Sequence, residues 1–201
     1  MRTVGELVLP GLSYIGATGA DGAMSRLYRV CAVDPCPMCP VGRAGPERMV
    51  AWFALEGPVR EVIHKLKYGD RPSLAGPLVE LGLRQGDLPP GVVVPVPLGR
   101  SRRRDRGYNQ AEALARKIAA GTGRQRLEGL RRARETDAQV GRGGAERRRA
   151  LEGAFAWRGW VPEEILVVDD VVTTGATLVE CARAARAAGV KRVHTLAVAL
   201  G

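Results

Sequence analysis

The chain has 201 residues, of which 45% are hydrophobic and 26% are charged. This length is typical of one domain, and the composition excludes a disordered or collagen-like chain, because the 26 Gly and 13 Pro residues follow no repeat. No apolar run approaches the roughly 18 residues that a membrane-spanning helix needs, so we expect a soluble globular protein.

Basic residues outnumber acidic ones by 31 to 21, and the excess is concentrated in one segment. Residues 100–150 hold 16 basic and 6 acidic side chains, which accounts for the whole net charge of +10. Arginine supplies 27 of the 31 cations, and its planar guanidinium binds phosphate well. The clustering therefore indicates a polyanionic ligand or partner; the alternative is an arginine-rich composition with solvated helix faces.

The four cysteines are too few for a disulfide scaffold, and the N-terminus does not resemble a signal peptide, so we expect a cytoplasmic protein. Residues 1–50 are rich in Gly and Pro and contain Cys31, Cys36 and Cys39. They show no sustained periodicity, which favours an irregular N-terminal appendage. Residues 51–201 then form the main domain.

Helices and strands alternate along the main domain. Apolar residues at helical spacing predict two helices, one containing Val59 and Leu66 and the next running from Leu74 to Leu81. The further predicted elements are a strand at 92–96, an arginine-rich loop at 100–106, a helix at 109–120, a mobile Gly/Arg segment within 121–150, an edge strand at 155–157, a buried strand at 165–170, a helix at 177–188 and a final strand at 193–200. This alternation predicts an α/β fold with a mainly parallel sheet flanked by helices.

The segment from Ile165 to Thr177 has the most specific pattern in the chain. Four apolar residues are followed by two adjacent acids, Asp169 and Asp170, at the predicted carboxyl end of a strand, where open α/β sheets bind ligands. A turn containing Thr173, Thr174 and Gly175 then leads into a helix, whose first amides can surround an anion. Carboxylates for hydroxyl groups and amides for a phosphate together suit a phosphorylated ribose. No Gly-Lys-Ser/Thr sequence supports a P-loop instead.

This segment resembles the signature of type I phosphoribosyltransferases, which binds phosphoribosyl pyrophosphate (PRPP). The resemblance implies that Asp169 and Asp170 hold the ribose hydroxyls and that the following turn wraps the 5′-phosphate. The PRPP-binding residues implied in this way are Asp169, Asp170, Val171, Val172, Thr173, Thr174, Gly175, Ala176 and Thr177.

Four further landmarks appear in order across residues 58–200 and resemble the ComF (competence protein F) family, also called GntX-like. They are His64-Lys-Leu-Lys-Tyr-Gly69, Val94-Pro-Val-Pro97, Arg106-Gly-Tyr-Asn-Gln-Ala111, and the series Thr136, Gln139, Arg147-Arg-Arg149 and Gly153-Ala-Phe155. The resemblance implies a type I phosphoribosyltransferase-like fold, a Mg²⁺-PRPP substrate, transfer of the phosphoribosyl group to an acceptor, and a link to DNA uptake in natural transformation.

Donors for the pyrophosphate of PRPP are expected near the end of the 92–96 strand. The candidates are Lys67, Tyr68, Leu98, Arg100, Arg102 and Arg106.

Two departures from the family pattern stand out. Its members commonly carry a four-cysteine zinc finger, whereas this chain has Cys31, Cys36 and Cys39, which indicates a zinc site without an obvious fourth ligand or a metal-free remnant. Ala150 stands where the family often has Asn.

Two alternatives to an enzyme acting on an unidentified acceptor stay open. The chain could bind PRPP or a nucleotide without turnover and interact with single-stranded DNA or the DNA-uptake machinery through its basic segment. It could also be a purine or pyrimidine salvage enzyme, although no base pocket is identifiable from the sequence.

Overall fold

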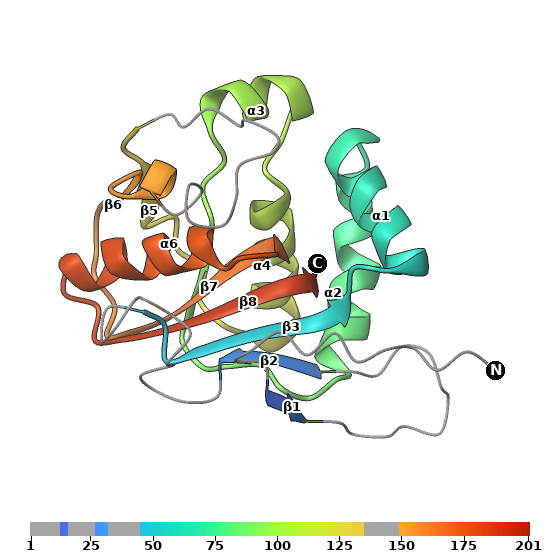
Figure 1. The fold of residues 1–201 in the computed structure, drawn as a ribbon, viewed down its shortest axis with the longest axis horizontal. Coiled ribbons are helices and arrows are strands. Elements are labelled where there is room, and N and C mark those ends of the chain that lie inside the picture. Colours follow the sequence, from blue (N-terminus) through green and yellow to red (C-terminus); the bar gives the residue numbers. More distant parts are fainter. Residues whose placement is uncertain (1–12, 16–26, 32–44, 135–148) are drawn as a thin grey trace.

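The structure is a computed structural model that describes residues 13–15, 27–31, 45–134 and 149–201. A six-stranded sheet forms its centre (Figure 1). The strand order is β1-β2-β3-β8-β7-β4. The strands are β1 (Ser13–Ile15), β2 (Leu27–Cys31), β3 (Arg48–Ala54), β4 (Val92–Pro95), β7 (Glu164–Val172) and β8 (Arg192–Leu200). Strands β3, β8, β7 and β4 are parallel to one another, while β1 and β2 add antiparallel pairs at one edge. The predicted mainly parallel α/β fold is confirmed.

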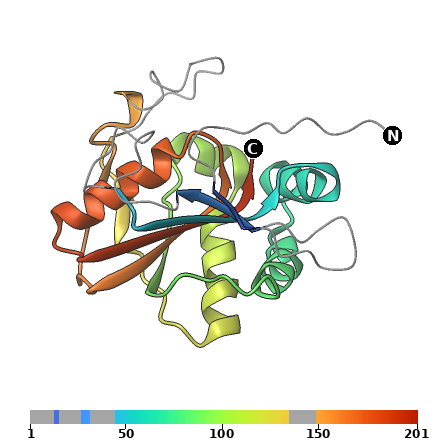
Figure 2. The same cartoon turned by 60° about the horizontal axis from the view of Figure 1, so that its bottom comes forward.

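Helices cover both faces of this sheet. On one face lie α1 (Gly57–Tyr68), α2 (Ala75–Leu83) and α4 (Gln110–Thr122), whose apolar side chains pack on those of β3, β7 and β8. On the other face lie α6 (Ala176–Ala187) and a two-stranded ribbon of β5 (Leu130–Arg132) and β6 (Phe155–Trp157). Figure 2 shows α4 in yellow-green and α6 in orange-red on opposite sides of the strands.

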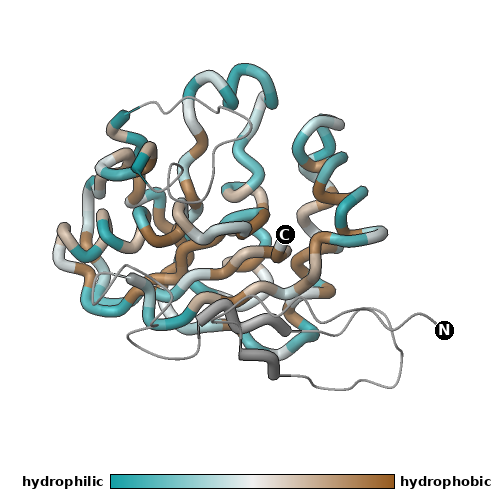
Figure 3. Tube along the Cα trace, in the orientation of Figure 1, coloured by the Kyte–Doolittle hydropathy of each residue, from teal (hydrophilic) through white to brown (hydrophobic). Residues whose placement is uncertain are grey.

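The central strands read as near-continuous apolar runs because both of their faces are buried. In β8, seven consecutive residues from Val193 to Ala199 are buried, and β7 has the run Ile165–Val168. Figure 3 shows hydrophobic residues gathered along these strands and polar residues toward the outer turns of the helices. Such runs are typical of parallel strands covered by helices on both sides.

Two predictions of local structure need revision. Residues 100–106 form a helix, α3 (Arg100–Arg106), so the predicted loop is wrong. Arginine is a good helix former, and the helix ends at Gly107, whose φ of 73° suits glycine. The predicted edge strand at 155–157 exists as β6, but it pairs with β5 in the separate ribbon. The helix at 109–120 and the one at 177–188 are confirmed as α4 and α6, each within two residues.

The N-terminal region contributes strands to the main sheet. Within residues 1–50 the structure describes β1, β2 and the beginning of β3, so the domain boundary drawn at residue 50 falls inside β3. Cys31 ends β2, while Cys36 and Cys39 lie outside the described residues. So does most of the Gly/Arg segment predicted to be mobile, namely residues 135–148.

None of the described helices combines the length and apolar composition that a membrane crossing requires.

A close contact between Gly82 of α2 and the indole of Trp52 on β3 sets the distance between helix and sheet. Trp52 is fully buried, and a Cβ placed on Gly82 would lie 2.0 Å from its Cε3 atom. Glycine is therefore required here by close approach of the helix backbone to the ring, not by its dihedral angles. This contact positions α2, and with it the loop that leads back to β4.

We predict that Gly82→Ala lowers the free energy of unfolding by about 1–3 kcal/mol, because overpacking a core forces backbone or side-chain shifts. Denaturant unfolding monitored by circular dichroism measures the change. The double variant Gly82→Ala/Trp52→Leu should lose clearly less stability than the sum of the two single variants, since the smaller side chain makes room for the methyl group. Strict additivity would show that the indole does not oppose the added Cβ.

Candidate functional site

Strand β7 lies between β4 and β8, and this pairing carries the predicted acids to the carboxyl edge of the sheet. Val168 lies beside Pro95 of β4 and beside Leu196 of β8, and Asp169 follows beside Ala197. Because the three strands are parallel, their carboxyl ends open on the same edge, where α/β proteins bind ligands. The turn into α6 begins at this edge.

The pleat of β7 separates the two acids. Asp169 shares the α6 side of the sheet with its neighbour Ala197, whereas Asp170 lies on the side of α1 and α4. The backbone N–H of Asp170 donates to Oδ1 of Asp169 at 2.9 Å. The two carboxylates therefore straddle the end of one strand and do not form a side-by-side pair.

The turn after β7 forms a small cavity with Asp169. It has a volume of about 40 Å³ and is lined by Asp169 and residues 171–178. Gly175 begins α6 with a φ of 71°, and a Cβ at this position would meet the thioether of Met49 at 3.3–3.4 Å. Thr173 and Thr174 are exposed, so the free amides of the first turn of α6 and these hydroxyls are accessible to an anion from solvent. The structure thus brings Asp169 and the predicted phosphate-binding residues together.

The pKa of Asp169 is raised from 3.8 to about 7, first by burial of the carboxyl and then by the neighbouring charge of Asp170. The hydrogen bond from the Asp170 amide and the charges of Lys67 and Arg102 act in the opposite direction. The effect of burial on the pKa of Asp169 is therefore larger than the opposing effect of the cations around it. A strongly perturbed acid at the ligand-binding edge of a sheet is typical of a functional site.

The end of α1 supplies the counterion of the second acid. Lys67 Nζ lies 3.4 Å from Asp170 Oδ2, and both side chains are largely buried, with 22% and 12% exposed. Tyr68, the next residue, is 65% exposed and packs beneath the guanidinium of Arg106, which lies 5.2 Å from its ring centroid. Of the pyrophosphate-side candidates, Lys67 thus contacts Asp170 directly, while Tyr68 and Arg106 contact each other.

Residues 106–110 form hydrogen bonds that hold α1, the end of β4 and the start of α4 together beside this site. The Tyr108 hydroxyl donates to the carbonyl of Leu66 in α1. Asn109 caps α4 by accepting from the Ala111 amide at 3.1 Å, and its side-chain amide donates to the Val96 carbonyl at 2.9 Å. Gln110 is buried and accepts from Arg106 at 3.2 Å. These contacts tie α1, the end of β4 and α4 together, a role that sequence reasoning did not assign.

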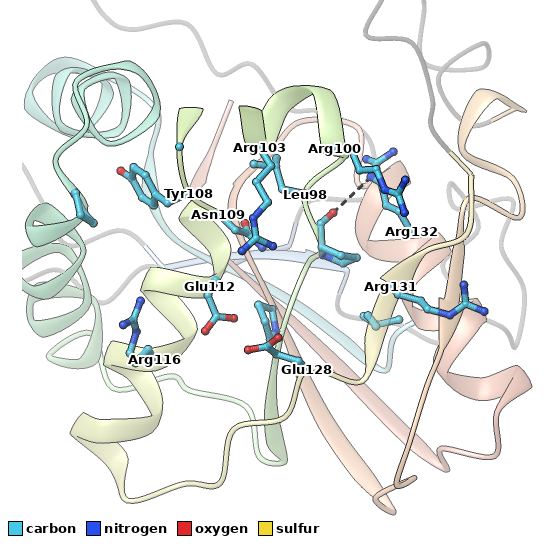
Figure 4. Close-up of a pocket in the computed structure, with 15 residues that line it drawn as sticks. Leu98, Arg100, Arg103, Tyr108, Asn109, Glu112, Arg116, Glu128, Arg131 and Arg132 are labelled. Atoms are coloured by element: carbon cyan, nitrogen blue, oxygen red, sulfur yellow. Dashed lines mark hydrogen bonds between the residues drawn. The ribbon is translucent and has the colours of Figure 1, made fainter. Parts of the chain in front are cut away.

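The remaining pyrophosphate-side candidates divide between two places. Arg102 is close enough to lower the pKa of Asp169. Leu98 and Arg100 instead line a larger groove on the outer side of β4 (Figure 4), which shares no residue with the cavity at the α6 turn. The structure therefore does not bring all six candidates to one point.

The described residues contain no group of three or more His, Cys, Asp or Glu side chains placed to hold a metal ion. Cys181 is buried in α6, as expected from its helical position. His194 lies at the amino end of β8 with Nε2 3.1 Å from Glu164 Oε1, far along the strands from the two acids. Neither residue belongs to the site.

The fold and this edge define the class of protein: a type I phosphoribosyltransferase-like α/β domain. No protein-family model matches the chain. It is 30% identical over 207 aligned positions to the DNA utilization protein YhgH of Escherichia coli O157:H7, covering 88% of this chain and 91% of that protein. It is 33% identical over 115 positions to Competence protein F of Haemophilus influenzae, covering 55% and 50% of the two chains. The chain therefore belongs to the ComF family.

We predict that Asp169 makes stability depend on pH. The native state keeps a proton on this carboxyl up to a pH of about 7, whereas the unfolded chain releases it near 3.8, so the free energy of unfolding falls as the pH rises between these values. Asp169→Asn removes this decrease in the free energy of unfolding, because asparagine does not titrate. From pH 4 to pH 8 the stability of the variant relative to wild type should increase by about 4 kcal/mol, measured by urea unfolding across that range.

The exposed Asp105→Asn in α3 serves as the control and should follow the wild-type pH profile. A constant stability difference between Asp169→Asn and wild type from pH 4 to pH 8 would contradict the raised pKa of Asp169.

Proposed function

We propose that this chain binds Mg²⁺-PRPP at the carboxyl edge of β7 and transfers its phosphoribosyl group to an acceptor. The observation that carries the proposal is the cavity in which the acid Asp169 faces the turn Val171–Thr177 at the start of α6. Membership of the ComF family supports it, because the phosphoribosyltransferase-like signature of that family lies on the same residues.

The two ends of a ribose 5-phosphate suit the two halves of the site. A phosphate at the α6 turn would accept hydrogen bonds from the free amides of the first helical turn and from the hydroxyls of Thr173, Thr174 and Thr177. The ribose would then lie across the end of β7, where its hydroxyls can donate to Asp169 on one side and Asp170 on the other. Hydrogen bonds to an ionised carboxylate, the form that Asp169 takes above a pH of about 7, are among the stronger ones in proteins.

Lys67 is placed to respond to the ligand. In the absence of ligand it neutralises Asp170 at 3.4 Å. When ribose hydroxyls bind this carboxylate, Lys67 can turn toward the pyrophosphate of PRPP without leaving the site, because its long side chain rotates about a fixed backbone at the end of α1. The Tyr108 hydroxyl bonded to the Leu66 carbonyl holds that backbone in place.

The proposed reaction is a substitution at C1 of the ribose. The bond between C1 and the pyrophosphate oxygen breaks, a bond from the acceptor nucleophile to C1 forms, the acceptor proton passes to solvent, and pyrophosphate leaves. Mg²⁺ prefers oxygen ligands, and with the carboxylates of Asp169 and Asp170 beside the ligand oxygens it would offset the charge of the leaving group. The cations Lys67 and Arg102 beside the acids would stabilise the same charge.

The names of the relatives suggest where the reaction is used. Because one is a DNA utilization protein and another a competence protein, we place the activity of this chain in the uptake or use of DNA.

A second candidate is a PRPP-binding module without turnover that interacts with single-stranded DNA. It is favoured by α3, which carries five arginines in seven residues beside the end of β4, most of them exposed. Binding of this kind would depend on neutralising backbone phosphates and would weaken steeply with salt.

Isothermal titration of the full chain with Mg²⁺-PRPP tests the proposal. Asp169→Asn and Asp170→Asn should each weaken binding about tenfold or more, since a hydrogen bond to a charged group contributes roughly 1.5–3 kcal/mol. Glu163→Gln, just before the opposite end of β7, is the matched control and should bind as wild type. Equal affinity of all four proteins would reject the site.

Turnover is tested separately by Mg²⁺-dependent release of pyrophosphate. Release stimulated by a free purine or pyrimidine base would identify a salvage enzyme. Salt-sensitive binding of single-stranded DNA with tight PRPP binding and no pyrophosphate release would favour the module.

A further inference from the structure

The connection between β4 and α3 consists of residues 96–99 and begins beside the end of β7. Its first residue, Val96, still follows the sheet, because its N–H donates to the Val168 carbonyl at 2.9 Å. Val168 directly precedes Asp169, and α3 at the other end of the connection carries Arg102, whose charge acts on Asp169. Both ends of the connection therefore lie close to this acid.

Asn109 holds the start of the connection with one side chain that has two roles. Its Oδ1 atom accepts from the Ala111 amide at 3.1 Å and so caps α4, while its Nδ2 atom donates to the Val96 carbonyl at 2.9 Å. Val96 is thus bonded on two sides, to β7 through its N–H and to the start of α4 through its carbonyl. A carboxamide suits this position, because the first contact requires an acceptor and the second a donor.

The next carbonyl of the connection is held from the other face of the sheet. The Arg132 Nε–H donates to the Pro97 carbonyl at 3.4 Å (Figure 4). The same guanidinium lies over the Phe155 ring, 5.0 Å from its centroid. Arg132 belongs to β5 and Phe155 to β6, the ribbon on the α6 face. Two consecutive carbonyls are therefore fixed by side chains that come from opposite faces.

The amides that follow these two carbonyls are available to a ligand. Neither the Leu98 N–H nor the Gly99 N–H donates to a backbone carbonyl of the residues that the structure describes. Residues 97–99 carry no polar side chain, so the connection can offer an anion only these backbone N–H groups. Their position depends on the two carbonyls that fix the chain just before them.

We propose that Asn109 is a positioning residue, which sets the connection after β4 so that the Leu98 and Gly99 amides receive the pyrophosphate of PRPP. The inference rests on the proposed function and adds the residue that fixes the pyrophosphate half of the site. Asn109 acts through the Val96 carbonyl and contacts no ligand atom itself. Without its N–H donor the connection can move, while the contacts of the ribose 5-phosphate half at Asp169 and residues 173–177 stay in place.

Isothermal titration of the full chain with two ligands tests this role, because ribose 5-phosphate lacks the pyrophosphate. Asn109→Ser keeps a hydroxyl that can cap α4 but is too short to bond the Val96 carbonyl as well. We expect this variant to weaken binding of Mg²⁺-PRPP about fivefold or more, with less than about a twofold change for ribose 5-phosphate. Asn109→Asp also keeps the cap and lacks the donor, so it should lose PRPP affinity at least as strongly.

A matched control removes stability from α4 without touching the connection. Ile118 is fully buried on this helix, and Ile118→Val deletes one methyl group from the core. This variant should bind both ligands as wild type does. Thermal unfolding confirms that all three variants are folded.

A ligand-free readout tests the positioning directly. In ¹⁵N-labelled chain without ligand, Asn109→Ser should shift the backbone amide signals of Leu98 and Gly99, while the signals of residues 173–177 stay in place. A merely structural cap on α4 would leave the Leu98 and Gly99 signals where they are in wild type, and that result would overturn the proposal.

The titrations separate this inference from the proposed function. Unchanged PRPP affinity in Asn109→Ser, or equal weakening of both ligands, would overturn the positioning role and leave the ribose 5-phosphate site intact. A loss seen in Asn109→Asp alone would assign the effect to the added charge and would overturn it as well. Failure of wild type to bind Mg²⁺-PRPP would instead reject the proposed function, and this inference with it.

Discussion

The parallel pairing of β7 between β4 and β8 is the constraint on which the rest of the structure depends. Each strand is bonded along its length to the next, so the carboxyl ends of all three reach one edge of the sheet. This register sets Asp169 beside Ala197 and starts α6 directly above. It also directs the chain after β4 into α3, which brings the arginine-rich helix to the same end of the molecule (Figure 1).

The pleat of β7 gives its two acids different surroundings. Asp169 faces the turn and α6, where burial keeps its pKa high, while Asp170 faces α1 and is paired with Lys67. Two neighbouring carboxylates at the end of a core strand oppose folding, and the Asp170 amide, Lys67 and Arg102 offset part of that cost. An arrangement that reduces stability at a ligand-binding edge is typical of residues kept for function.

Much of the site could be predicted from the sequence because its pattern is local. The apolar run before Asp169 and the Gly175 turn predict a strand, a bend and a helix within thirteen residues, and the structure has all three. The helix α3 was missed because a run of arginines was interpreted as a solvated loop, although arginine favours helices and Gly99 and Gly107 flank the segment. Strand β3 has no counterpart among the predicted elements, and the boundary predicted at residue 50 lies inside it.

Contacts between residues distant in the sequence could not be predicted in this way. Lys67 and Asp170 are 103 positions apart, and only the packing of α1 beside β7 brings them to 3.4 Å. The groove outside β4 likewise joins α3, α4 and the segment before β5, none of which carries a recognisable motif for it. Local periodicity determines the elements, whereas the sheet order decides which side chains meet.

Nuclear magnetic resonance of the ¹⁵N-labelled chain, titrated with ribose 5-phosphate, tests the central claim most directly. If the turn after β7 holds the phosphate, the backbone amide signals of residues 173–177 shift in a saturable manner, while those of Glu163 and Glu164 at the other end of the strand stay in place. Signals of the turn that do not move at saturating ligand, or shifts confined to other parts of the chain, would contradict the account.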